Sequence, residues 1–370
     1  MAKQRDQINR IPVRTWNWLG VNESTLALHL PTVTEYRKQP VCETSDPKVK
    51  ITEIGACRGL INRLETENRL EAGASASTSA FAAGQFNSGY FIETGPGEKC
   101  ETPVVLQYEL DEENPVLVDQ HFIYARENSE LTVVIRYASQ AGSKACHYGL
   151  TKIIACPGAV VRLVKVQLLA GDAEHIDAVG SAAGEQSVID CTLIELGAQQ
   201  VISNCQTRLA GTGSTGNINS IYFGDKRRQI DIHYQLTYQA RDTVGEIKAR
   251  GALLDQSRKT FRGTLDFMRG ARGAKGKEEE YVVLLSPEVR NQSIPLMLCA
   301  EDAVEGQHAA SAGKVDENKL FYLMSRGLSE TEAKKLVIEA AFQPILAEVP
   351  LPALQQEIAD YVQGRLSHVQ

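Results

Sequence analysis

Short runs rich in Val, Ile, Leu and Tyr recur along the middle of the chain, from about residue 90 to residue 300. Gly, Asn, Asp and Ser separate them, and nothing between them has the 3.6-residue periodicity of a long helix. Runs of this length and composition predict β-strands. The clearest ones cover residues 102–110, 130–138, 159–169, 187–196, 229–239 and 259–268.

Some two hundred residues of successive strands require an architecture that protects the edges of its sheets. A sandwich, a barrel and a stacked β-solenoid all satisfy this requirement. Many of the runs lack two-residue hairpin signals such as Asn-Gly, which favours long coils over antiparallel meanders. No strict short repeat is present, which argues against a regular hexapeptide β-helix and leaves an irregular one open.

The two ends of the chain have helical patterns. The segment 57–72 places Leu60, Ile61 and Leu64 on one face, and predicts an amphipathic helix. The segment 72–89, rich in Ala, Ser and Gly, predicts a loop or linker. We therefore expect an N-terminal mixed and helical region over 1–75, a β core over 76–310 and a C-terminal helical region over 311–370.

The C-terminal region predicts three helices. The first covers 317–327, where Gly327 suits a left-handed helix end. Ser329 and Glu332 form an S-x-x-E capping box that opens the second. The third has an apolar stripe of Leu354, Ile358, Tyr361, Val362 and Leu366. The first two helices expose more apolar surface than so small a unit can bury, so we expect a docking surface there, around Leu320, Phe321, Tyr322, Arg326 and Gly327.

Composition and charge narrow the class of protein. Apolar residues at 43% and charged residues at 23% are ordinary for a soluble globular protein. The net charge of −7 argues against nucleic acid or an anionic membrane as the main partner. No apolar run approaches the length of a membrane span, and the first residues lack the apolar region of a secretory signal. We therefore expect a cytoplasmic protein.

The eight cysteines are scattered, and none forms a C-x-x-C pair. A zinc knuckle and a self-contained ferredoxin-type cluster motif are therefore absent. We expect reduced thiols that are mostly buried as small apolar residues. A composite site, assembled from distant residues or from two chains, stays open. The cysteines are residues 42, 57, 100, 146, 156, 191, 205 and 299.

Two glycine-rich segments resemble nucleotide-binding motifs but lack their context. The segment 211–216, GTGSTG, matches G-x-G-x-x-G, yet a strand-like sequence follows it where a helix would be required. The segment 270–279, GARGAKGKEE, lacks the first glycine and the final hydroxyl of a phosphate-binding loop, so the chain is not a P-loop ATPase. The basic residues from 258 to 277 and the three glutamates at 278–280 indicate a solvated surface. No hydrolase signature is present.

His308 lies among Ala and Gly residues, immediately before the helical region. Small neighbours allow a second backbone, a substrate or a metal to approach closely. A lone histidine is more often structural than chemical, and both a structural role and a ligand or proton-transfer role stay open for His308 at this point.

The segment 299–342, which contains His308, closely resembles the C-terminal signature of the SufB/SufD family of the SUF iron–sulfur cluster assembly system. The segments 88–139 and 232–265 agree with this resemblance. The Glu-Asp before the histidine and the GKVDE continuation are more similar to SufD than to SufB. Ala309 matches neither the glutamate usual in SufB nor the glycine usual in SufD, and Gly306 replaces a cysteine found in some SufD proteins.

The resemblance implies a right-handed parallel β-helix core flanked by α-helical N- and C-terminal regions. It also implies a non-enzymatic scaffold that pairs with a SufB-like paralogue through its core and docks a SufC-like ATPase through its C-terminal helices. A homodimer is an open alternative. His308 would then ligate iron only in the complex; no cofactor is expected in the isolated chain, where an iron–sulfur cluster would be a transient cargo of the complex.

A second hypothesis is a stand-alone β-helix enzyme or a carbohydrate-binding solenoid that uses His308 and nearby carboxylates. Such sites usually present rows of aromatic or acidic residues on one face of the solenoid. Aromatic residues make up only 6% of this chain, which makes the signal weak.

Overall fold

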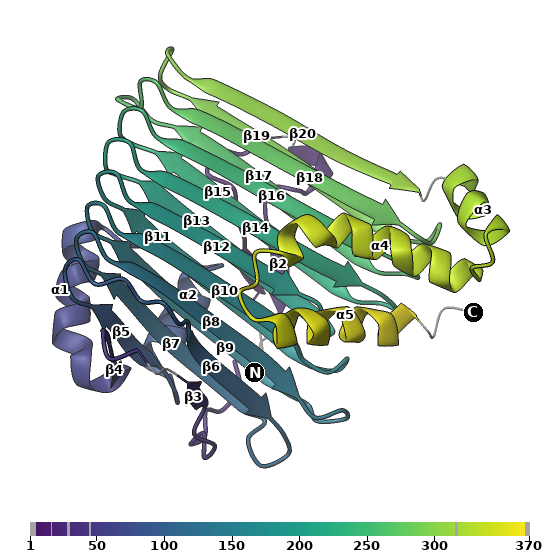
Figure 1. Ribbon diagram of the computed structural model, residues 1–370, viewed down its shortest axis with the longest axis horizontal. Helices are drawn as coiled ribbons and strands as arrows, with labels where there is room; N and C mark the ends of the chain where they lie inside the picture. Colours follow the sequence, from purple (N-terminus) through teal and green to yellow (C-terminus); the bar gives the residue numbers. More distant parts are fainter. Residues whose placement is uncertain (1–4, 16, 28–29, 44–45, 315–316, 367–370) are drawn as a thin grey trace.

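The computed structural model describes residues 5–15, 17–27, 30–43, 46–314 and 317–366. Its centre is a parallel β-solenoid of about eight turns, in which each turn contributes one strand to each of two nine-stranded sheets (Figure 1). The predicted parallel β-helix core with flanking helices is therefore confirmed. Along one row of the solenoid the paired residues are Val133, Leu163, Cys191 and Ile218, so the length of a turn varies and no short repeat marks it.

The two sheets are named here by their strands. Sheet I contains β3 (Val41–Glu43), β6 (Val104–Leu110), β8 (Glu130–Ser139), β10 (Val160–Leu168), β12 (Val188–Glu195), β14 (Thr215–Gly224), β16 (Val244–Leu253), β18 (Lys275–Leu284) and β20 (Glu305–Lys314). Sheet II contains β4 (Val49–Glu53), β5 (Tyr90–Thr94), β7 (Val116–Ala125), β9 (Cys146–Ala155), β11 (Glu174–Ala183), β13 (Gln200–Leu209), β15 (Gln229–Tyr238), β17 (Arg258–Phe267) and β19 (Arg290–Cys299).

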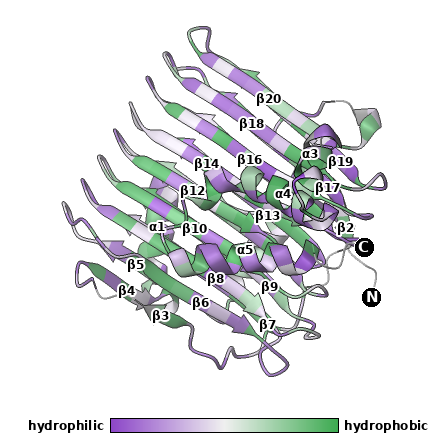
Figure 2. Cartoon of the chain, turned by 45° about the vertical axis from the view of Figure 1, so that its right-hand side comes forward, coloured by the Kyte–Doolittle hydropathy of each residue, from purple (hydrophilic) through white to green (hydrophobic). Residues whose placement is uncertain are grey.

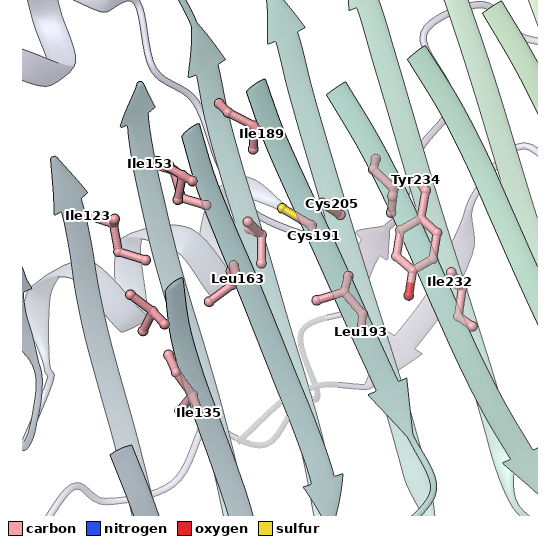
Figure 3. Close-up of a cluster of buried hydrophobic side chains, with 14 of the residues drawn as sticks. Ile123, Ile135, Ile153, Leu163, Ile189, Cys191, Leu193, Cys205, Ile232 and Tyr234 are labelled. Atoms are coloured by element: carbon pink, nitrogen blue, oxygen red, sulfur yellow. The ribbon is translucent and has the colours of Figure 1, made fainter. Parts of the chain in front are cut away.

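The space between the sheets is filled mainly by apolar side chains. Figure 3 shows Ile135, Leu163 and Leu193 of sheet I facing Ile123 and Ile153 of sheet II. Each such side chain that leaves water stabilises the fold by about 1.5–3 kcal/mol. The core forms because the alternation of side chains along a strand sends every second residue inward.

The two ends of the solenoid differ. At the N-terminal end, β3 and β4 pair antiparallel with β6 and β5 and so close the first turn. At the other end, β19 and β20 each pair with one strand only, β17 and β18 respectively, within the described residues. The C-terminal end of the solenoid therefore presents two unpaired strand edges.

The N-terminal elements pack outside sheet II. They are β1 (Arg5–Ile8), η1 (Asn17–Leu19), β2 (Ser24–Ala27), η2 (Ile54–Cys57), α1 (Arg58–Asn68) and α2 (Ala76–Gly84). As predicted, α1 is amphipathic, and it buries Ile61 and Leu64 against Phe91 and Phe122 of the solenoid.

The prediction of a loop over 72–89 is wrong, because α2 lies within it. Ser75 caps this helix: its hydroxyl accepts a hydrogen bond from the backbone of Thr78, whose hydroxyl accepts one from the backbone of Ser75. Alanine is the strongest helix former, so the small-residue composition that indicated a loop instead favours a helix once it is capped and packed. Ala82 is buried against Tyr148 of β9.

The three C-terminal helices are confirmed as α3 (Glu317–Ser325), α4 (Glu330–Leu346) and α5 (Pro352–Leu366). Figures 1 and 2 show α4 and α5 lying against the outer face of sheet I. Their apolar stripes, including Ile338 and Ile358, join the core cluster of Val166 and Ile194. Pro344 lies inside α4 near its end, and the predicted capping box at Ser329 and Glu332 is present. No helix in the described part of the chain is long and apolar enough to span a membrane.

Candidate functional site at the open end of the solenoid

His308 lies on β20, the last strand of sheet I. Its Cα partner on β18 is Glu278, and Nδ1 of His308 lies 2.6 Å from Oε2 of Glu278. The His308 side chain is 25% exposed, whereas that of Glu278 is only 2% exposed. A histidine that keeps one face accessible while a buried carboxylate holds the other is an arrangement suited to presenting a ring nitrogen to a ligand.

The row of side chains that leads to His308 is apolar until the last two turns. It contains Val133, Leu163, Cys191, Ile218 and Ile247, each buried in the core. Glu278 and His308 then continue the same row. A buried carboxylate is costly unless it is paired, so packing alone does not account for the change from apolar to ionisable residues.

A second buried carboxylate, Glu280, also points into this end of the solenoid. Its Oε1 accepts hydrogen bonds from the Lys259 ammonium and the Tyr222 hydroxyl, each at 2.6 Å. Lys259 also donates to the backbone oxygen of Gln292 and the hydroxyl of Ser293. Burial lowers the pKa of Lys259 although Glu280 opposes this, and burial raises the pKa of Tyr222. The group ties β17 of sheet II to β18 and β14 of sheet I.

These contacts correct the prediction that residues 258–280 form a solvated surface. Glu278, Glu280, Lys259 and Arg262 are all buried. The strand period explains the error: in β18 the side chains of Glu278 and Glu280 point inward, while Glu279 between them faces outward toward Arg250 and Lys277. A run of charges therefore divides between the core and the surface when it falls on a strand.

A third polar group lies deeper in the solenoid and is sealed from solvent. Asp119 of β7 lies within hydrogen-bond distance of His147 and His121, and Nδ1 of His147 lies 2.8 Å from Nδ1 of His175. Burial alone would raise the pKa of Asp119, but His147 and His121 outweigh it and lower the pKa well below its usual range. Because these side chains are fully buried, we assign them to the interior of the fold and not to an accessible site.

The predicted docking residues lie on α3 and on the turn that follows it. Phe321 and Tyr322 are 73% and 57% exposed, and Leu320 is half-buried. The Arg326 guanidinium lies over the Tyr322 ring, and Gly327 has the left-handed conformation expected for a helix end. Met324 of α3 and Leu336 of α4 add further exposed apolar surface. Partner binding by these residues remains a prediction.

The cysteines differ in part from expectation. All eight are free thiols, but only Cys191 and Cys205 are buried, whereas Cys42 and Cys299 are exposed. Within the described residues, no group of three or more His, Cys, Asp or Glu side chains is arranged to hold a metal ion. The role of His308 as an iron ligand remains a prediction.

A parallel solenoid with one open, polar end defines a class of β-helical protein but not its function, and comparison with known proteins supplies the family. Residues 108–341, more than half of the chain, match the SufBD core domain of SUF system FeS cluster assembly. The chain belongs to this SufB/SufD family, as its sequence predicts.

Individual relatives agree with this assignment. The chain is 28% identical over 289 residues to the iron–sulfur cluster assembly protein SufD of Bacillus subtilis, covering 78% of this chain and 66% of that protein. It is 26% identical to SufBD family iron–sulfur cluster assembly proteins of Staphylococcus saprophyticus and Staphylococcus epidermidis, covering 74% and 72% of this chain and 59% and 57% of theirs. The matches therefore span less than two-thirds of the length of these relatives.

Reasoning from the sequence identified His308 but missed Glu278, Glu280, Lys259 and Tyr222. The available signal was the alternation in residues 275–284, which places every second residue of that segment on one face. Which face is the inner one depends on the register with the preceding turn, and that register is visible only in the folded solenoid.

Proposed function

We propose that this protein is a SufD-like, non-catalytic component of an iron–sulfur cluster assembly complex. In that complex it pairs with a SufB-like core and docks a SufC-like ATPase, and the cluster is cargo that the complex assembles. The observation that carries this proposal is the open end of the solenoid. There His308 lies on β20, an edge strand that pairs only with β18 within the described residues, in a chain that belongs to the SufB/SufD family.

The unpaired edges support pairing with another β core. β20 is exposed along almost its whole length, and one edge of each of β19 and β20 has no strand partner among the described residues. Natural proteins usually cover or break such edges, because another strand can pair with them. A second solenoid placed end to end, from a SufB-like paralogue or from a second copy of this chain, would satisfy both edges together.

Within that interface, His308 would supply one ligand to iron. Neutral imidazole is a suitable ligand for iron, and the small residues Gly306, Ala309 and Ala310 on β20 leave room for an approaching backbone. Since no metal site is complete within the described residues, the partner chain would supply the remaining ligands. The isolated protein is therefore expected to bind iron weakly or not at all.

The surface of α3 and α4 supports docking of the ATPase. Phe321, Tyr322, Met324 and Leu336 are exposed, so they do not cap the β core, whereas Ile338 of α4 is buried in it. α3 rests on α4 and leaves one apolar face uncovered within the described residues. A hydrophobic face of this kind on a short helical pair is the usual form of a helix-in-groove contact.

Anaerobic co-expression with a SufB-like and a SufC-like protein tests the proposal. We expect the three chains to purify together, with a native mass that accounts for each subunit and with iron and sulfide bound to the complex. A chain that stays monomeric in their presence, or that turns over a polysaccharide by itself, would contradict the proposal and favour the stand-alone β-helix alternative.

A further inference from the structure

We propose that Glu278 is a positioning residue that fixes the tautomer and orientation of His308. It holds the Nδ1–H toward the interior and leaves Nε2 as the free, unprotonated nitrogen. The role of this contact in iron binding rests on the proposed function. The geometry of the contact involves only residues of this chain.

The proposed proton position follows from the contact between the two side chains. Nδ1 of His308 lies 2.6 Å from Oε2 of Glu278, and a carboxylate accepts hydrogen bonds, so we place the proton on Nδ1. Nε2 of His308 has no hydrogen bond or ion pair with any residue that the structure describes. An imidazole in water prefers the opposite tautomer, with the proton on Nε2, so Glu278 reverses the intrinsic preference of the ring.

Glu278 is enclosed by neighbouring strands. Gly263 on β17 leaves room for its carboxylate, because a Cβ added there would lie 2.1 Å from Oε1 of Glu278. The carboxylate is 2% exposed, and His308 is its one hydrogen-bond partner among the described residues. The ammonium of the buried Lys259 interacts electrostatically with Glu278, but its ion pair is with Glu280.

Carboxylates that orient a ligating histidine are a general feature of metal sites. They fix the ring and raise its basicity, and their removal typically lowers metal affinity about 10- to 100-fold. On β20 the need is greater, because the part of the chain that the structure describes places no strand beyond this edge strand to restrict the ring. With Glu278 in place, Nε2 is presented to the partner in the form that can bind iron.

The tautomer can be measured in the isolated protein by NMR of ring ¹⁵N-labelled histidine, with His308→Gln assigning the signal. At about pH 9, where an imidazole is ordinarily neutral, we expect Nδ1 of His308 to be protonated in the wild type. Glu278→Met keeps an unbranched side chain and removes the acceptor, so the proton should move to Nε2 or divide between the nitrogens. The control Glu279→Gln, on the outer face of the same strand, should leave the wild-type signal unchanged.

A wild-type His308 protonated on Nε2, or an unchanged signal in Glu278→Met, would overturn the inference whatever the protein's function. In the anaerobic complex, the variant Glu278→Met also tests whether the contact between Glu278 and His308 supports iron binding. We expect the Fe²⁺ affinity of the Glu278→Met complex to fall about 10- to 100-fold. A changed tautomer with unchanged iron affinity would instead overturn the iron-ligand role of His308, which belongs to the proposed function.

Discussion

Lys259 and Glu280 form an ion pair inside the solenoid, with Nζ of Lys259 2.6 Å from Oε1 of Glu280 and both side chains at most 1% exposed. The pair joins sheet II to sheet I directly beneath the open end. The Tyr222 hydroxyl shares the same oxygen, while Oε2 of Glu280 has no hydrogen-bond partner among the described residues. Buried charged contacts therefore link the two sheets beneath the open end, as the Lys165–Asp177 pair does in an earlier turn.

Removing one member of this pair should destabilise the protein strongly. For Lys259→Met or Glu280→Met alone we expect the free energy of unfolding to fall by about 3–5 kcal/mol, because each change leaves a buried polar group without its partner. The double variant Lys259→Met/Glu280→Met should lose much less, since no buried charge remains unpaired. Urea unfolding of the four proteins gives the coupling energy, and additive single losses would show that the pair does not act as a unit.

His233 should make the protein sensitive to acid. Burial, with a smaller contribution from the nearby Arg262, lowers the pKa of His233 to about 3, and Thr264 is its hydrogen-bond partner. In the unfolded state a histidine has a pKa of ~6.5. Between this pKa and the folded-state pKa of about 3, the unfolded state binds more protons than the folded state. The free energy of unfolding therefore falls as the pH falls. Between about pH 6.5 and pH 4 this group alone should remove about 3 kcal/mol.

The variant His233→Gln isolates this contribution, because glutamine can still reach Thr264 but does not titrate. We expect its free energy of unfolding to depend less steeply on pH below about 6.5 than that of the wild type. Parallel curves for the two proteins from pH 7 to pH 4 would contradict the assignment. The comparison removes the contributions of other groups, such as His147, whose pKa burial also lowers.

Substitutions of exposed residues on the α3–α4 surface should change ATPase binding without changing the stability of the protein. Tyr322→Ala and Arg326→Ala change exposed side chains that contact each other, so we expect unchanged melting and lost binding to the SufC-like ATPase. Ile338→Ala is the matched control on α4: its side chain is buried, and its loss should lower the free energy of unfolding by about 2–5 kcal/mol. Retained ATPase binding in Tyr322→Ala and Arg326→Ala would place the docking site elsewhere.

The sequence predicts the helices at the C-terminus well because their signals are local. The capping box at Ser329 and the left-handed Gly327 depend on residues a few positions apart, and both occur as expected. Strand β11 contains many small residues, and no local pattern distinguishes it from a loop. Its strand conformation comes from the neighbouring turns with which it pairs.

The candidate site is predictable only in part for the same reason. His308 is identifiable because it lies in a segment that resembles a known family. The inward direction of Glu278 and Glu280 depends on pairing with Ile247 and Ala249 of the preceding turn, which lies some thirty residues away in the chain. Without that register, a run of charged residues indicates an exposed surface. The burial of Glu278 and Glu280 is therefore not expected from the sequence.

Iron and sulfide analysis shows whether His308 contributes to cluster assembly at an interface between two cores. The measurement compares the anaerobically purified complex of wild-type protein with that of His308→Ala. Because His308 is partly exposed on an edge strand, the variant should fold and assemble normally, so subunit composition and native mass serve as controls. We expect less iron and sulfide per complex in the variant. Full cluster content in a normally assembled His308→Ala complex would show that His308 does not contribute to cluster assembly.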